Sequence, residues 1–186
     1  KHLLSLINDI LDISRIESGR EEIEQTLFDV DTVLSELHEM LHLQANDKKL
    51  ILNYKLDNKP CIISSDYKKF RHILQNLIAN AVKFTDKGSV NTMVSLIENK
   101  LIIDVVDTGI GISNENIEYI FDEFRQADSS TSRRFGGTGL GLAIVKHIIE
   151  AHKEKIYVES EFGIGSEFSF TIEKTKIKKQ ELNNTN

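Results

Sequence analysis

Apolar residues recur along the chain at two spacings, which predict helices and short strands in alternation. Intervals of three and four residues predict helices over residues 3–16, 33–45, 70–81, 114–124 and 143–149. Short apolar runs and alternating patterns predict strands at Thr26–Val30, Lys49–Leu56, Cys61–Ser64, Ser89–Ile97, Lys100–Asp107, Lys155–Ser160 and Ser166–Glu173. Asp31 or Thr32 is expected to cap the second helix, and Asp66 the third.

The first predicted helix is apolar around about half of its circumference. The residues concerned are Leu3, Leu4, Leu6, Ile7, Ile10, Leu11 and Ile13. This apolar face is wider than a two-helix seam needs, and it suits a helix within a four-helix bundle. The rest of the chain is long enough for one ordinary domain, and a hydrophobic content of 40% is sufficient for a real core.

Glycines cluster in two turns that flank a long loop. Asp107-Thr108-Gly109-Ile110-Gly111 follows a predicted buried strand, and Gly136-Gly137-Thr138-Gly139-Leu140-Gly141-Leu142 precedes a predicted helix. Glycine lets backbone N–H groups approach an anion closely, and the start of a helix adds unpaired N–H donors. The order of elements therefore predicts a phosphate-binding site, although either turn by itself is more often an ordinary loop.

Two amides and an ammonium group share one side of the predicted helix upstream. Asn76, Asn80 and Lys83 follow one another at i, i+4 and i+7, beside the apolar stripe of that helix. The stripe consists of Phe70, Ile73, Leu74, Leu77, Ile78 and Ala81. An amide oxygen is a hard ligand of the kind that Mg²⁺ takes, and Lys83 can contact a phosphate. The alternative is a solvated polar face, which composition alone favours.

Five segments resemble, in order and spacing, the motifs of two-component sensor histidine kinases. Asn76–Thr85 resembles the asparagine box and Phe121–Phe124 the phenylalanine box, while the glycine boxes correspond to Asp107–Gly111, Gly137–Gly141 and Gly163–Ser166. The stretch around Phe124–Asp128 and Arg133–Gly137 looks most like the hybrid subclass. The resemblance covers about Lys1–Lys174, which is nearly the whole chain.

This resemblance implies an α/β fold, a two-layer α/β sandwich of the Bergerat type that gyrase, heat-shock and mismatch-repair ATPases share. Residues 1–20 would be part of the second helix of the dimerisation and phosphotransfer hairpin. Residues 21–174 would be the catalytic ATP-binding domain. Residues 175–186 have little apolar content and would be a flexible linker or tail.

The resemblance also implies roles for individual residues. Asn80 would hold Mg²⁺, and Asn76 would lie beside the metal and the phosphates of ATP. Lys83 would approach a phosphate, Phe84 the adenine or ribose, and Asp107 would accept the exocyclic amine of adenine. Further residues of the pocket and its lid would be Gly109, Gly111, Ile112, Phe124, Gly137, Thr138, Gly139, Leu140 and Gly141. The γ-phosphate would be neutralised by Arg125, or by Arg133 and Arg134, and Gln126–Phe135 would form a mobile lid.

The reaction implied is transfer of the γ-phosphate to a histidine, with ATP hydrolysis or non-catalytic ATP binding as alternatives. The related ATPases have a Glu four residues before the metal-binding Asn, and Asn76 at that position cannot act as a base. The phosphoacceptor box of the family, His-Glu/Asp-x-x-x-Pro, does not occur here, since His2 is followed by Leu-Leu-Ser-Leu. We therefore expect that the given chain does not phosphorylate itself.

Another short pattern, His38-Glu39-Met40-Leu41-His42, matches the His-Glu-x-x-His motif of zinc peptidases. The downstream continuation of that motif is absent at Gln44–Lys48, and a zinc site needs a third ligand. Both histidines are therefore expected on the helix surface.

The formal net charge of −6 argues against nucleic-acid binding, and it means that Mg²⁺ and basic residues must offset the charge of ATP. A single cysteine, Cys61, excludes an internal disulfide and fits a reducing compartment. No apolar run is long enough to span a membrane and no signal peptide is present, so a soluble, cytoplasmic domain is expected. The partners implied by the resemblance are ATP, the histidine-bearing helix of the same or a partner subunit in a homodimer, and a response-regulator receiver domain.

Overall fold

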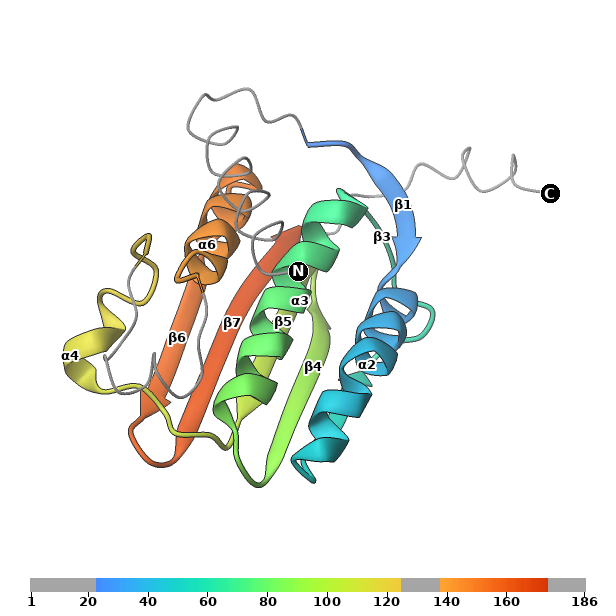
Figure 1. The fold of residues 1–186 in the computed structure, drawn as a ribbon. Coiled ribbons are helices and arrows are strands. Elements are labelled where there is room, and N and C mark those ends of the chain that lie inside the picture. Colours follow the sequence, from blue (N-terminus) through green and yellow to red (C-terminus); the bar gives the residue numbers. More distant parts are fainter. Residues whose placement is uncertain (1–22, 125–137, 174–186) are drawn as a thin grey trace, which may run out of the picture.

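The computed structural model describes residues 23–124 and 138–173, in which helices pack on one face of a sheet (Figure 1). The elements are β1 (Thr26–Asp29), α2 (Val30–Asp47), β2 (Ile51–Leu56), β3 (Ile62–Ser65), α3 (Tyr67–Phe84), β4 (Ser89–Ile97), β5 (Lys100–Asp107), α4 (Asn114–Ile117), α6 (Gly141–Ala151), β6 (Ile156–Glu161) and β7 (Gly165–Glu173). The expected two-layer α/β architecture is confirmed. The helix predicted over residues 3–16, the tail 175–186 and the lid Gln126–Phe135 lie outside the described residues.

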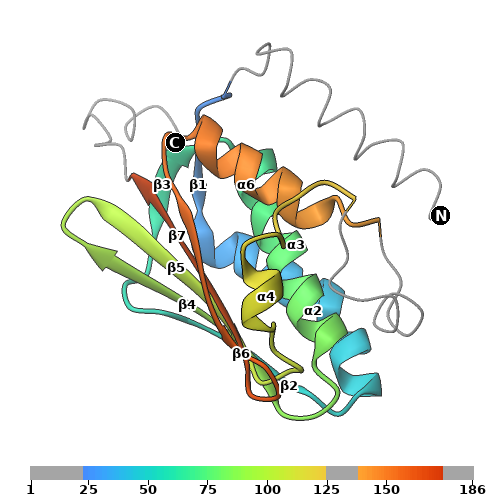
Figure 2. The same ribbon diagram turned by 90° about the vertical axis from the view of Figure 1, so that its left-hand side faces the viewer.

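The main sheet has five strands in the order β2-β4-β5-β7-β6, and β1 pairs with β3 in a separate two-stranded sheet. β2 runs parallel to β4, whereas all other neighbours in the main sheet are antiparallel. Figure 2 shows α2, α3 and α6 on one face of this sheet. β5 lies at the centre of the sheet. Buried and half-buried residues alternate along most of this strand, so that its last residue, Asp107, is on the buried face.

Helix α3 is the centre of the helical layer, since it packs against α2, α6, β4 and β5. The predicted apolar stripe of α3 is confirmed, and every residue in it is at most 5% exposed. Burial of this stripe fixes the rotation of the helix. Asn76, Asn80 and Lys83 are consequently half-buried at the margin of the core rather than on its solvent face.

Asp66 caps α3 as predicted, and its Oδ1 accepts a hydrogen bond from the backbone N of Lys69 at 3.0 Å. The prediction that Asp31 or Thr32 caps α2 is wrong, because the cap is Asp29 and the helix begins at Val30. Asp29 Oδ1 accepts from the backbone N of Asp31 at 3.1 Å and from that of Cys61 at 3.2 Å. One carboxylate thus ends β1, starts α2 and holds the chain next to β3.

The helix predicted over residues 114–124 is also wrong beyond Ile117, where α4 ends. None of the α4 residues is buried, so packing does not prolong the helix. Phe121 instead packs edge-on against Phe168 of β7, with ring centroids 6.4 Å apart, and Phe124 has a φ of 58°. The strands agree within one or two residues, and β2 begins at Ile51 because Lys49 has a φ of 57°.

No helix within residues 23–124 and 138–173 combines the length and the apolar character that crossing a membrane requires.

Candidate functional site

Asp107 holds its carboxylate on the buried side of the sheet, where the residue is 8% exposed. Asp107 Oδ1 accepts a hydrogen bond from the backbone N of Gly109 at 2.8 Å, and the backbone of Ser166 donates another. Burial raises the pKa of Asp107 above its ordinary value, and these two bonds offset the shift only in part. A buried carboxylate with few donors is suited to accept an N–H group from a ligand.

The turn after Asp107 is joined to the end of α3. Ile110 N donates to Phe84 O at 3.2 Å. A Cβ atom at Gly109 would lie 2.5 Å from Phe84 O, 2.8 Å from Asp107 Oδ1 and 2.9 Å from Thr85 Oγ1. Only glycine fits there without displacing its neighbours, which explains the first glycine of the box in physical terms.

The hydroxyl of Thr85 borders the same small space beside Gly109 as the Asp107 carboxylate. Thr85 is fully buried, and its Oγ1 has no hydrogen-bond partner among the described residues. Because a buried polar atom without a partner is costly, this hydroxyl is suited to bond a polar ligand atom or a bridging water. The sequence placed Thr85 in the asparagine box but assigned it no role. Its position directly after the helix was the available signal.

Asn76 brings the asparagine box into contact with the second glycine box, Gly137–Gly141. Its Nδ2 donates to His72 O at 3.2 Å, and a Cβ atom at Gly141 would lie 2.8 Å from Asn76 Oδ1. The amide of Asn76 therefore sits against the first residue of α6, on the same side of α3 as Asn80.

Lys83 is half-buried one turn further along α3, with Nζ 4.7 Å from the centroid of the Phe84 ring. Burial lowers the pKa of Lys83 below its ordinary value. A nearby anion would favour the charged form, so this position suits an ammonium group that meets a phosphate.

Helix α6 starts at Gly141 without a side-chain cap within the described part of the chain. Gly139 has a φ of 74°, and the backbone N of Leu140 donates to Thr138 Oγ1 at 3.2 Å. The Leu140 side chain is fully buried in the core, which anchors the turn. The first N–H groups of this 11-residue helix are thus placed to bind an anion.

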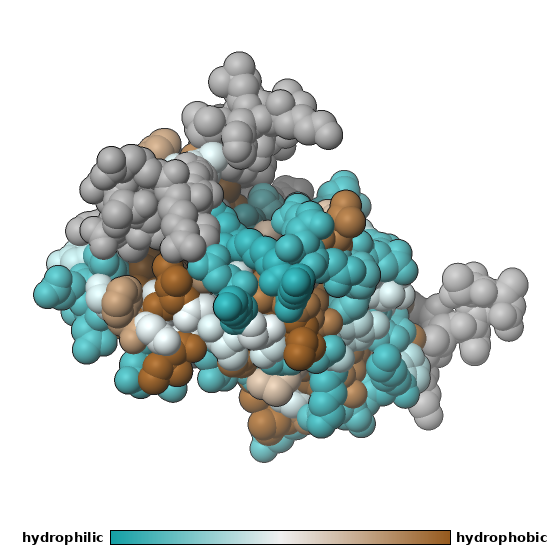
Figure 3. All heavy atoms as spheres, turned by 60° about the horizontal axis from the view of Figure 1, so that its bottom comes forward, coloured by the Kyte–Doolittle hydropathy of each residue, from teal (hydrophilic) through white to brown (hydrophobic). Residues whose placement is uncertain are grey.

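The turn between β6 and β7 contacts the loop that follows Asp107. Gly163 N donates to Ile110 O at 2.7 Å, and a Cβ atom at Gly111 would collide with the carbonyl of Glu161. Figure 3 brings this end of the molecule forward and shows apolar patches separated by polar ones. Phe162 and Ile164 in the turn are 73% and 62% exposed.

Of the remaining predicted site residues, Ile112 and Phe124 are described by the structure, and the others lie outside the described residues. Ile112 is half-buried and its backbone N donates to Ser160 Oγ at 2.8 Å, whereas Phe124 is 63% exposed. The residues for which the structure gives no placement are Arg125, Arg133, Arg134 and Gly137.

The two histidines of α2 differ from each other. His42 is exposed as predicted, but His38 is half-buried, with Nε2 2.7 Å from Leu52 O and its ring packed against Tyr54. The prediction that His38 is a surface residue is therefore wrong, because β2 covers it. No group of three His, Cys, Asp or Glu side chains in the described ranges could hold a metal.

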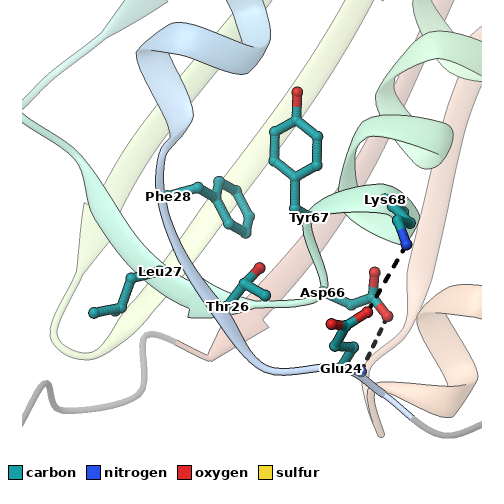
Figure 4. A pocket seen from close by; sticks show the side chains of 7 residues that line it. All are labelled: Glu24, Thr26, Leu27, Phe28, Asp66, Tyr67 and Lys68. Carbon is teal, nitrogen blue, oxygen red and sulfur yellow. Dashed lines mark hydrogen bonds and ion pairs between the residues drawn. The ribbon is translucent and has the colours of Figure 1, made fainter.

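A hollow of about 260 Å³ lies elsewhere, between β1 and the start of α3 (Figure 4). Its lining residues are Glu24, Thr26, Leu27, Phe28, Asp66, Tyr67 and Lys68. The backbone N of Glu24 donates to Asp66 Oδ2 at 3.1 Å, and the Glu24 carboxylate lies 3.9 Å from Lys68 Nζ. Dashed lines mark both contacts in Figure 4. None of the predicted site residues that the structure describes lines this hollow, so it is separate from the Asp107 site.

Comparison with protein families matches residues 65–176, more than half of the chain, to the HATPase_c family, described as histidine kinase-, DNA gyrase B-, and HSP90-like ATPases. The chain belongs to this family. The resemblance seen in the sequence is thereby confirmed, and HATPase_c membership makes the chain an ATP-binding domain.

Relatives of this chain include sensor kinases and hybrid signal transduction histidine kinases. The autoinducer 2 sensor kinase/phosphatase LuxQ of Vibrio cholerae is 39% identical over 178 residues, which are 92% of this chain and 21% of that protein. The sensor protein GacS of Pseudomonas syringae is 37% identical over an alignment of 191 positions that covers 100% of this chain and 21% of that protein. The chain thus spans about a fifth of the length of these relatives.

Solved structures of histidine kinases share the fold. Full-length ShkA in complex with AMPPNP superposes with a TM-score of 0.83 at 33% identity, over 92% of this chain and 35% of that one. The nucleotide-free catalytic domain of ThkA gives a TM-score of 0.71 at 27% identity, over 81% of this chain and 96% of that one. The described HATPase_c fold is therefore that of a histidine kinase catalytic domain.

Proposed function

We propose that this chain binds Mg²⁺-ATP between α3, the Asp107 turn and the start of α6, and donates the γ-phosphate to a histidine. The acceptor would lie on the dimerisation helix of the same or a partner subunit in a homodimer, and a receiver domain would take the phosphoryl group onto an aspartate. Support comes from the similarity to sensor kinases, to hybrid signal transduction histidine kinases and to ShkA, which was crystallised with AMPPNP.

The observation that carries the proposal is the buried carboxylate of Asp107. It is held at the end of β5 by Gly109 N at 2.8 Å, beside the hydroxyl of Thr85, which has no hydrogen-bond partner among residues 23–124 and 138–173. Within an apolar surrounding, this pair offers an acceptor and a hydroxyl to an amine-bearing ring. Such a constellation recognises an adenine amino group and disfavours a carbonyl at the same ring position.

The phosphates of ATP would meet the other half of the site. The start of α6 offers backbone N–H groups, and Lys83 offers an ammonium group whose desolvation an anion offsets.

The donor set fits Mg²⁺, because Asn80 and Asn76 present neutral amide oxygens rather than a cage of carboxylates. Mg²⁺ held by few protein ligands shares its coordination with phosphates and waters. When bound there it would neutralise charge on the phosphates, with Asn80 as the protein ligand.

Transfer to histidine is preferred to hydrolysis because Asn76 occupies the position at which the related ATPases have the Glu that activates water. Asn76 Nδ2 donates to His72 O at 3.2 Å, and an amide has no basic site for a proton from water. Arg125, Arg133 and Arg134 remain the candidate cations for the γ-phosphate.

The test uses γ-labelled ATP and Mg²⁺ with this chain alone and with a longer form of the protein that carries a histidine-bearing upstream helix. We expect acid-labile label on a histidine of the longer form and none on this chain, and chelation of Mg²⁺ should abolish the labelling. Release of free phosphate without labelled protein would identify a hydrolase and overturn the assignment of Asn76.

A further inference from the structure

A lysine outside all the motif boxes contacts the end of α3. Lys48 Nζ donates to Lys83 O at 2.6 Å, to Val82 O at 2.9 Å and to Thr85 O at 3.1 Å. An ammonium group has three N–H donors, which matches three carbonyl acceptors. No pattern in the sequence singles out Lys48, since the contact depends on how α2 packs against α3.

These contacts complete the hydrogen bonding of the helix end. The last carbonyls of a helix lack intrahelical partners and carry partial negative charge. Thr85 N donates to Ala81 O and Phe84 O accepts from Ile110 N, while Lys48 Nζ donates to the carbonyls of Val82, Lys83 and Thr85. Thr85 is fully buried and Val82 is 2% exposed, so water has little access to these two residues of the turn. The cation therefore stabilises the last turn of α3 by adding side-chain donors to its carbonyl groups.

The backbone of Lys48 is itself fixed. It is the C-cap of α2, where its N–H donates to Ala45 O at 3.2 Å. Lys49 follows with a φ of 57°, and Leu50 N also donates to Ala45 O, at 2.9 Å. The chain thus reverses tightly into β2 and holds the Lys48 side chain against α3 at a small entropic cost.

The turn that Lys48 holds carries much of the proposed nucleotide site. It bears the side chains of Lys83, Phe84 and Thr85, and Phe84 O anchors Ile110 next to the Asp107 turn. Lys48 is thus connected to both the phosphate end and the adenine end of the site through backbone carbonyls.

We propose that Lys48 is a positioning residue for nucleotide binding, which keeps the Val82–Thr85 turn in the conformation that ATP requires. This inference rests on the proposed function, since it assumes that the Asp107 site takes ATP. Without the ammonium group the turn would sample other conformations, and binding would have to restore the right one.

The experiment measures ATP affinity and thermal unfolding of wild type, Lys48→Met, Lys48→Arg and Lys49→Met. Lys48→Met should raise the Kd for ATP about tenfold or more at a temperature where the variant is folded. Lys48→Arg, which keeps a cation with N–H donors, should recover a large part of that loss. Lys49→Met is the matched control, because Lys49 is exposed, and its Kd should equal that of wild type.

The variant Ile172→Val tests whether a general loss of stability by itself weakens ATP binding, because it changes the core at the end of β7, far from Asp107. It should lower the unfolding temperature and leave the Kd unchanged. Amide exchange supplies a second readout, because the Ile110 N–H should exchange faster in Lys48→Met. If wild type binds ATP and folded Lys48→Met binds it with the same Kd, only the role proposed for Lys48 is overturned. Absence of ATP binding by wild type would overturn the proposed function as well.

Discussion

Asp66 lies at the start of α3, and the turn that begins with Asp107 contacts the end of this helix. Both aspartates are buried, at 6% and 8% exposure. Asp66 accepts from the backbone N of Lys69 and of Glu24, and Lys69 Nζ lies 3.5 Å away. Burial would raise its pKa, but these partners outweigh burial and the pKa is lowered. The pKa of Asp107 is raised instead, because burial outweighs its two backbone bonds.

The difference separates an acid that builds the fold from one suited to a ligand. Asp66 uses its acceptor capacity to cap α3 and to hold the segment before β1. Asp107 has acceptor capacity left and lies beside the Thr85 hydroxyl, which is unpaired within the part of the chain that the structure describes. Burial alone would not distinguish the two residues. The number of donors around each carboxylate does.

The largest expected effect is on nucleotide affinity. Asp107→Asn should weaken ATP binding about a hundredfold or more, because the new amide presents a donor to the adenine amine or loses its bond to Gly109. Asp66→Asn should leave the Kd within a few-fold of wild type. Titration calorimetry measures both, and Asp104→Asn on the outer face of β5 is the control. Equal Kd values for the Asp107 and Asp104 variants would refute the adenine assignment.

In the absence of nucleotide, the change at Asp66 should lower the stability of the protein more than the change at Asp107. Asp66→Ala removes a helix cap and a second backbone bond, so the free energy of unfolding should fall by about 2 kcal/mol. Asp107→Asn keeps an acceptor for Gly109 N and removes a poorly solvated charge, so the change should stay within about 0.5 kcal/mol. Urea unfolding gives both values. Ser113→Ala serves as the control, because Ser113 caps α4 without a side-chain bond to the backbone. A larger loss for Asp107→Asn than for Asp66→Ala would break the comparison.

Sequence patterns predicted the elements with long periodic signals. The stripe of α3 and the bounds of β4 and β5 agree with the structure, because each buries one face along most of its length. The segment 114–124 was predicted as a helix from its apolar spacing. There the contact of Phe121 with Phe168, a residue distant in sequence, decides the conformation.

The site was predictable as a set of residue types and less so as a set of contacts. Spacing identified Asp107, Asn76 and Gly141, but it could not show that Asn76 Oδ1 lies against Gly141. Lys48 was missed because its three acceptors are backbone carbonyls, which leave no signature in a sequence. The roles of the site residues in nucleotide binding remain predictions that the variants test.

The smallest expected effect is on the pH dependence of stability, and it should have opposite signs for the two aspartates. For Asp66 the folded pKa lies below the ordinary value of 3.8, so its contribution is present above that pH and is lost as the pH falls through the folded pKa. For Asp107 the folded pKa lies above 3.8, so its contribution is complete below that pH and is lost as the pH rises through the folded pKa.

Unfolding midpoints of wild type, Asp66→Asn and Asp107→Asn between pH 3 and pH 7 would show these signs. The advantage of wild type over Asp66→Asn should shrink towards acid, while the stability of wild type relative to Asp107→Asn should improve towards acid. Parallel curves for the two variants would mean that both carboxylates experience the same environment when the protein is folded. In that case the donors around Asp66 would not account for its role, and the unpaired capacity of Asp107 would no longer mark it as the acid that meets the ligand.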